Sequence, residues 1–155
     1  MKKLSLLFCL VFTLFCLISC QPKERDKVNI VDENIAFAAD QYGLLLESIE
    51  NSEKLLNPKS IINGKMKYIP PQEWTSGFFP GSLWYLYALT GDESWKSVAI
   101  KYTEMLDTIQ YFTGNHDIGF MIGCSYGNGL RFAGKNDYKE VIIQAAKSLC
   151  TRYNP

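Results

Sequence analysis

The sequence has little of what several classes of protein need, because it contains one histidine, His116, and carries no net charge. Sixteen basic residues balance sixteen acidic ones, and the densest basic segment, residues 23–27, alternates in sign. A nucleic-acid-binding function is therefore excluded, since such proteins concentrate Lys and Arg on one surface. With a single histidine and no cysteine at ligand spacing from it, the sequence implies no metal and no other cofactor.

Cysteine is also scarce where a folded domain is expected. Of the five cysteines, Cys9 and Cys16 lie in an apolar N-terminal run, and only Cys124 and Cys150 fall within the predicted domain. Both occupy apolar faces of predicted helices. We therefore expect them to pack in the core and not to form a disulfide framework.

The N-terminus has the pattern of an export signal. Two lysines precede an apolar run over residues 4–18, which is shorter than the roughly twenty residues that a membrane span needs. The run ends in Leu17-Ile18-Ser19-Cys20, which resembles the lipobox of bacterial lipoproteins, where cleavage precedes the cysteine and its sulfur receives a diacylglycerol. The sequence thus predicts a signal peptide at residues 1–19, lipidation of Cys20 and a polar linker at residues 20–30.

A protein processed in this way would be exported as a membrane-anchored lipoprotein facing the periplasm or the cell surface. Its contact with the membrane would be through the lipid anchor at Cys20 only. The alternative is an ordinary cleaved signal in which Cys20 is incidental.

Residues 31–155 are predicted to be all-α, because apolar residues recur at steps of three and four. The exception is residues 59–71, which contain Gly64 and two prolines and predict a loop with one short extended piece at residues 67–69. The predicted helices span residues 31–56 with Asp32 as the N-cap, 92–109 and 118–132. Another helix lies within the aromatic stretch 73–89, with Pro80 in its first turn and Trp74 in the loop ahead of it, and a last helix is capped by Asn136 and has an apolar stripe that reaches Tyr153.

An internal repeat relates two of these segments. When Gly91 is placed on Gly134, forty-three residues later, Trp95 matches Tyr138 and Leu106 matches Leu149. Each unit consists of an apolar helix, a glycine turn and an amphipathic helix, which is typical of stacked helical hairpins. Such hairpins need neighbours on both sides to bury their faces, and this chain offers at most two and a half of them.

Two places in the domain are candidates for chemistry. His116 and Asp117 fall at a loop-to-helix junction, where functional side chains are common, although Asp117 could merely cap the helix and His116 could be a surface residue. Trp74 lies in a loop ahead of the aromatic-rich helix, where it could offer a flat face to a sugar ring or could be a core anchor. Nearby Gly77 and Gly81 would allow close backbone approach.

Three motifs in the same order and spacing resemble the start of the unsaturated glucuronyl hydrolases, glycoside hydrolase family 88. The resemblance covers nearly all of the chain from about Ile35 onward. It implies an all-α arc of helical hairpins, the first two to three of an (α/α)6 barrel, which agrees with the repeat. The motifs are Trp74-Thr75-Ser76-Gly77-Phe78-Phe79-Pro80-Gly81, Leu89-Thr90-Gly91-Asp92 and His116-Asp117-Ile118-Gly119-Phe120.

The resemblance also implies an activity. Family members remove the 4,5-unsaturated uronic acid that lyases leave at the non-reducing end of glycosaminoglycan oligosaccharides. An aspartic acid protonates the C4=C5 double bond, water adds at C5, and the resulting hemiketal opens and releases the partner sugar. The motif match assigns Asp117 to the first of two aspartates, and His116 and Trp74 to the substrate subsite. The second aspartate has no counterpart before Pro155, so we expect this chain to be an inactive fragment by itself.

Two other functions stay open at this point. The unsaturated rhamnogalacturonyl hydrolases share the barrel and the hydration chemistry, although the motif at residues 116–120 favours family 88. The chain could also be a lipid-anchored protein that binds a carbohydrate with its helical hairpins and performs no catalysis.

Overall fold

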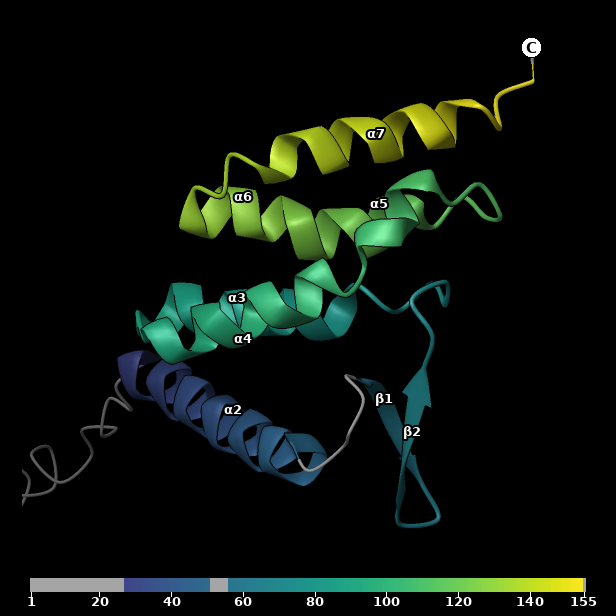
Figure 1. Cartoon of the computed structure of the whole chain (residues 1–155). Coiled ribbons are helices and arrows are strands. Elements are labelled where there is room, and N and C mark those ends of the chain that lie inside the picture. The colour runs from purple at the N-terminus through teal and green to yellow at the C-terminus, as the bar shows by residue number, and fades with distance from the viewer. Residues whose placement is uncertain (1–26, 51–55, 155) are drawn as a thin grey trace, which may run out of the picture. The chain divides into compact units, whose positions relative to one another are not determined.

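The computed structural model describes residues 27–50 and 56–154 (Figure 1). The predicted signal peptide, Cys20 and most of the predicted linker lie outside the described residues. The chain divides into two compact units, residues 1–34 and residues 35–155, and every candidate site residue of the domain belongs to the second unit. Within the described ranges, no helix combines the length and the apolar character that crossing a membrane requires.

The first helix, α2 (Lys27–Glu50), begins earlier than the sequence predicted. Asp32 lies inside this helix, so its prediction as the N-cap was wrong. Residues 27–31 contain no glycine or proline, so the helical conformation continues through them. In the second unit, the later turns of α2 pack on the core through partly buried Tyr42, Leu45 and Leu46.

A two-stranded hairpin replaces most of the predicted loop. Strand β1 (Asn57–Ile62) pairs antiparallel with β2 (Lys65–Ile69), and the pairing is irregular between Pro58 and Ser60. The turn residues Asn63 and Gly64 both have positive φ, 51° and 73°, which is the conformation that an Asn-Gly dipeptide favours between paired strands. That dipeptide was the sequence signal for a hairpin, and our prediction did not use it.

The first helical hairpin consists of α3 (Phe78–Thr90) and α4 (Glu93–Glu104). Gly91 ends α3 in the left-handed conformation, so the predicted glycine turn between the two helices is confirmed. Asp92 caps α4 by accepting a hydrogen bond from the Ser94 backbone N–H. Pro80 lies in the first turn of α3, where its missing N–H costs nothing. The helix predicted over residues 92–109 is shorter than expected, because α4 ends at Glu104 and a 3-10 turn, η1 (Asp107–Tyr111), follows.

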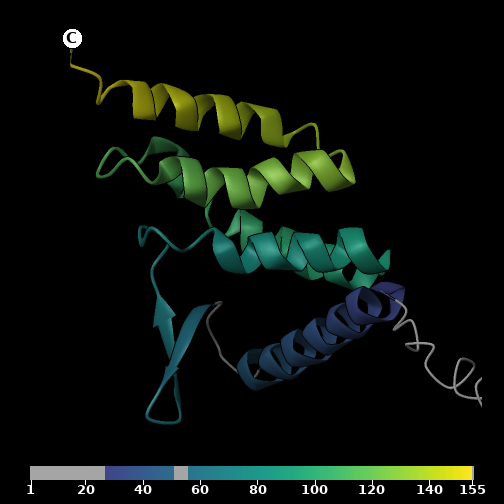
Figure 2. The ribbon, with the colours of Figure 1, turned by 180° about the vertical axis from the view of Figure 1, so that it is seen from behind.

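The second hairpin begins with a continuous helical run made of α5 (Ile118–Ile122), the π-helical segment η2 (Gly123–Gly127) and α6 (Asn128–Ala133). Gly134, with φ of 63°, ends it. Helix α7 (Tyr138–Cys150) then runs back along it (Figures 1 and 2). The positions of Gly91 and Gly134 confirm the predicted repeat.

Three details of the last segment differ from the prediction. Asp137, not Asn136, precedes α7, and its side chain makes no capping hydrogen bond. Tyr153 lies beyond the helix and is 78% exposed. Cys150 is exposed, so the expectation that it packs in the core was wrong, whereas Cys124 is half-buried. Both cysteines are free thiols. Cys150 is the last residue of α7, where fewer neighbours cover a side chain.

The core of the second unit joins the two hairpins. Trp84 of α3 is fully buried, and its indole N–H donates to Thr103 Oγ1 of α4 at 2.9 Å. A Cβ atom at Gly129 of α6 would lie 2.5 Å from the Tyr138 ring and 2.9 Å from the Trp84 ring. Only glycine therefore lets α6 approach both rings, and this contact packs the two hairpins together.

Candidate functional site

The loop that carries Trp74 lies between strand β2 and helix α3. Its turns are closed by backbone hydrogen bonds, from Ser76 N–H to the Glu73 carbonyl and from Phe78 N–H to the Thr75 carbonyl. At its end, Gly77 lies against α5, since a Cβ atom there would sit 2.7 Å from Met121 Cα. The sequence prediction of close approach at Gly77 is confirmed, and this contact brings the Trp74 loop to the helix that begins after Asp117.

Asp117 lies immediately before α5. Its backbone N–H donates to Asn115 Oδ1 at 2.9 Å, and its carbonyl accepts from the Phe120 and Met121 N–H groups. Its carboxylate makes no capping hydrogen bond to the helix, so the alternative in which Asp117 is a side-chain cap is wrong. The carboxylate is 21% exposed, and His116 Nε2 lies 3.4 Å from Asp117 Oδ1 in an imidazole that is 81% exposed.

Helix α7 and the residues after it form hydrogen bonds to the segment that precedes Asp117. Arg152 Nη1 donates to the Thr113 carbonyl at 2.6 Å, and buried Ser148 Oγ donates to the Gln110 carbonyl, also at 2.6 Å. These bonds hold the chain at Gln110 and Thr113, on the N-terminal side of Asp117.

Three exposed aromatic rings form a surface that we call the aromatic patch, composed of Trp74, Phe78 and Phe120. Phe78 makes edge contacts with both of the others, with centroids 5.7 Å from Trp74 and 6.3 Å from Phe120. The exposed fractions are 47%, 39% and 54% for Trp74, Phe78 and Phe120. Trp74 is therefore not a core anchor, and that alternative was wrong.

One residue of the aromatic patch, Phe120, lies in α5, the helix that directly follows Asp117. Phe120 follows Asp117 by three positions at the start of α5, and side chains at this spacing lie on the same side of a helix. The structure thus brings the Trp74 loop, from one sequence motif, to the start of α5, which directly follows Asp117 of another, and Phe78 contacts both Trp74 and Phe120. Sequence reasoning had quoted Phe78 and Phe120 within the motifs without giving them a role.

The glycines of the α5–α6 run do not behave alike. A Cβ atom at Gly119 or Gly123 would meet nothing within 4 Å, and both residues are exposed. Tight packing, which the sequence allowed as one reason for these glycines, applies to Gly129 alone among them. The face of α5 that bears Gly119 and Phe120 is accordingly open.

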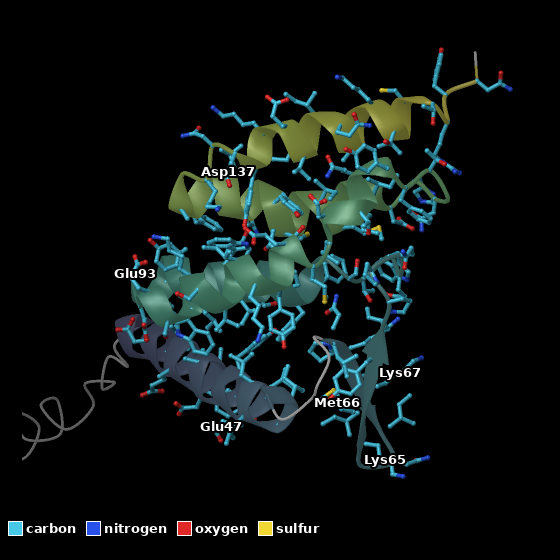
Figure 3. The ribbon with its side chains drawn as sticks, viewed as in Figure 1. Glu47, Lys65, Met66, Lys67, Glu93 and Asp137 are labelled. Atoms are coloured by element: carbon cyan, nitrogen blue, oxygen red, sulfur yellow. The ribbon has the colours of Figure 1, made fainter. Side chains whose placement is uncertain are left out.

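A cavity of about 490 Å³ lies beside Phe78, between α2, the hairpin and α3. Met66 points from β2 into its lining, whereas Lys65 and Lys67, on either side of Met66, point the other way (Figure 3). Its lining residues are Tyr42, Leu45, Pro58, Lys59, Ser60, Ile61, Met66, Thr75, Phe78, Phe79 and Ser82. No cluster of three or more His, Cys, Asp or Glu side chains suited to a metal ion occurs in residues 27–50 and 56–154.

Comparison with known proteins bears on this arrangement. The chain matches no protein-family model. It is 36% identical over 166 residues to an unsaturated glucuronyl hydrolase of Formosa agariphila, and the alignment covers 99% of this chain and 40% of that relative. The chain is a homologue of the unsaturated glucuronyl hydrolases.

Solved structures of unsaturated glucuronyl hydrolases share the fold. One that is specific for heparin is 39% identical, with a TM-score of 0.70 over 79% of this chain and 32% of that one. A variant of the Streptococcus agalactiae enzyme, in complex with dGlcA-GalNAc6S, is 27% identical, with a TM-score of 0.61 over 79% of this chain and 33% of that one. The chain therefore spans about a third to two-fifths of these relatives. Unsaturated glucuronyl hydrolases are α/α barrels, so the two helical hairpins are hairpins of such a barrel, as the sequence predicted.

Proposed function

We propose that this chain forms part of an unsaturated glucuronyl hydrolase that acts on lyase-generated glycosaminoglycan oligosaccharides. The reaction removes the 4,5-unsaturated uronic acid from the non-reducing end. A proton is delivered to C4 and water adds at C5, so that one water molecule is consumed. The hemiketal formed at C5 then opens and releases the partner sugar.

The observation that carries this proposal is that the aromatic patch includes Phe120 in the first turn of α5, the helix that directly follows Asp117. Sugar rings have apolar faces of C–H groups, and exposed aromatic rings are well suited to pack on them while hydroxyl groups stay in water. Three such rings exposed together on a small surface are unusual unless they bind something. In this proposal Trp74 contacts the sugar, and the patch holds it next to the carboxyl group of Asp117.

The roles of the two polar residues follow from their surroundings. The Asp117 side chain is only 21% exposed, and the turn and α5 hold its backbone, so its carboxyl group is carried by a fixed segment from which it can take part in proton transfer. His116 lies 3.4 Å from it and is far more exposed, so it is placed to contact the substrate from the solvent side. The second aspartate of the reaction would come from another part of the enzyme.

The test is an assay for loss of the C4=C5 double bond, followed by its ultraviolet absorbance. Because the chain spans about 40% of the Formosa relative, the assay uses a protein of the relatives' length that contains this chain. We expect turnover of an unsaturated chondroitin or hyaluronan disaccharide and a loss of at least about 100-fold in kcat for Asp117→Asn. Turnover of an unsaturated rhamnogalacturonan disaccharide alone would instead assign the chain to the sister enzymes. Binding without turnover would make it a carbohydrate-binding protein.

We further propose that the protein is exported and held at the membrane by a lipid on Cys20. The support is the lipobox-like ending Leu17-Ile18-Ser19-Cys20 after an apolar run. Cells that express the protein with labelled fatty acid should incorporate the label, and Cys20→Ser should abolish incorporation and release the protein from the membrane fraction. Equal labelling of both proteins would disprove the anchor.

A further inference from the structure

Glu73, the residue immediately before Trp74, is fixed by three hydrogen bonds. Its Oε1 accepts from Lys59 Nζ of strand β1 at 2.5 Å, and its Oε2 accepts from the Thr75 backbone N–H at 2.8 Å and from the Thr75 hydroxyl group. The carboxylate thus ties together the residues on both sides of Trp74 and connects them to the hairpin. The two charged side chains are only partly exposed, 33% for Lys59 and 22% for Glu73.

A second tie joins the same strand to the far end of the loop. Asn57, at the start of β1 and 1% exposed, donates from Nδ2 to the Ser76 carbonyl at 2.7 Å. The Ser76 hydroxyl group in turn donates to the Pro71 carbonyl at 2.8 Å. Strand β1 therefore holds the loop before and after Trp74.

The indole of Trp74 has no comparable support of its own. It is 47% exposed, and its ring contact with Phe78 is an edge contact at 5.7 Å. An exposed aromatic side chain takes its position chiefly from the backbone that carries it, because few neighbours restrict its rotamers. Where the ring stands in the aromatic patch is thus decided by the backbone at residues 73–76, and that backbone is tied to β1.

We propose that Lys59, Glu73 and Asn57 are positioning residues, through which the β-hairpin fixes Trp74 in the aromatic patch for contact with the substrate. The contact with substrate rests on the proposed function, whereas the placement of Trp74 does not. An isolated surface ion pair contributes little to stability. The main effect of the Lys59–Glu73 pair is therefore to fix the position of the loop backbone. It restricts a short loop that carries a functional side chain, which is the role that a supporting hydrogen-bond network has around a binding site.

The test measures the environment of Trp74 directly. The chain has three tryptophans, Trp74, Trp84 and Trp95, so 5-fluorotryptophan incorporation into the full chain should give three fluorine resonances, each assigned by a Trp→Phe variant. We expect Lys59→Met and Glu73→Gln to move or broaden the Trp74 resonance and to leave that of buried Trp84 unchanged. Lys59→Arg keeps the cation and should restore the resonance of the unaltered protein. Asp137→Asn, which removes an exposed ion pair with Lys135 elsewhere, is the matched control.

A second readout connects the loop to binding. Titration of a protein of the relatives' length that contains this chain with an unsaturated chondroitin disaccharide should show several-fold weaker binding for Lys59→Met and Glu73→Gln. Lys59→Arg should bind with an affinity close to that of the unaltered protein. An unchanged Trp74 resonance in Lys59→Met and Glu73→Gln would overturn the proposal. A moved resonance with unchanged affinity would also overturn it. If the longer protein without substitutions binds no oligosaccharide, the proposed function fails, and the fluorine spectra still decide whether the hairpin places Trp74.

Discussion

Gly77 lies directly against the backbone of Met121, so that a Cβ atom on the glycine would be 2.7 Å from Met121 Cα. This contact joins two motifs that are more than forty residues apart in the chain. It sets the distance between the Trp74 loop and the start of α5, and with it the contact of Phe78 with Phe120.

Replacement of Gly77 should therefore affect both stability and binding. The neighbouring atoms are backbone, which cannot rotate away, so Gly77→Ala should destabilise the fold by about 1–3 kcal/mol. The measurement is the urea midpoint, with Gly119→Ala as control. Gly119 has open space around it, and alanine is the better helix former by about 1 kcal/mol. Equal midpoints for the two variants would show that Gly77 has room for a side chain.

The exposed indole of Trp74 predicts a separation between folding and substrate binding. Trp74→Ala should leave the melting temperature within about 2 °C of the unaltered protein, because changes at exposed sites usually cost less than about 0.5 kcal/mol. It should nevertheless raise KM for the unsaturated disaccharide several-fold in the longer enzyme. Tyr153→Ala, at a 78% exposed position that is not part of the patch, should change neither quantity. A collapse of stability in Trp74→Ala would show that the ring is structural.

The hydrogen bond between Trp84 and Thr103 gives a prediction about the core. Thr103→Val has nearly the same shape but removes the acceptor of a fully buried indole N–H, which should cost about 1–3 kcal/mol. Thr103→Ser keeps the hydroxyl group and should lose less, since only a methyl group is removed. Urea unfolding of the two variants measures the difference. A valine variant as stable as the serine variant would mean that the indole N–H finds another acceptor.

The surroundings of Glu73 predict a dependence on pH. Partial burial acts to raise the pKa of the Glu73 carboxyl group, but the hydrogen bonds from Lys59 and Thr75 together outweigh it and lower the pKa below its ordinary value of 4.5. A lowered pKa in the folded state means that the ionised form stabilises the fold above the ordinary value, and that this stabilisation is lost as the pH falls through the lowered pKa. Glu73→Gln should therefore be less stable than the unaltered protein at pH 7.

The same difference should shrink in acid. Thermal unfolding measured from pH 7 down to pH 3 should show the two melting temperatures converging below pH 4.5. Asp137→Asn serves as the control, because the pKa of Asp137 is also lowered, chiefly by the Lys135 side chain, at a site remote from the loop. A difference between Glu73→Gln and the unaltered protein that stays constant over this range would show that the carboxylate charge is not the stabilising feature.

Features of this protein that depend on a few adjacent residues could be predicted from the sequence. Gly91 and Gly134 end helices in the left-handed conformation that glycine adopts without cost, and Asp92 caps α4 with its own side chain. The periodic apolar stripes and the repeat were sufficient for the helical hairpins. The errors at Asp32 and Asn136 also concern single helix ends, where several residues of similar capping preference compete.

The tertiary structure alone decided which side chains meet. The contacts of Gly77 with Met121, of Phe78 with Phe120 and of Glu73 with Lys59 join segments that no local pattern relates. The exposure of Trp74 and of Cys150 was equally hidden, because burial depends on what the rest of the chain covers and not on the polarity of the residue. The sequence by itself determined the helices and the candidate residues. Packing between elements determined that the Trp74 loop meets the helix that follows Asp117, since side chains distant in sequence become neighbours only when the backbones that carry them can approach.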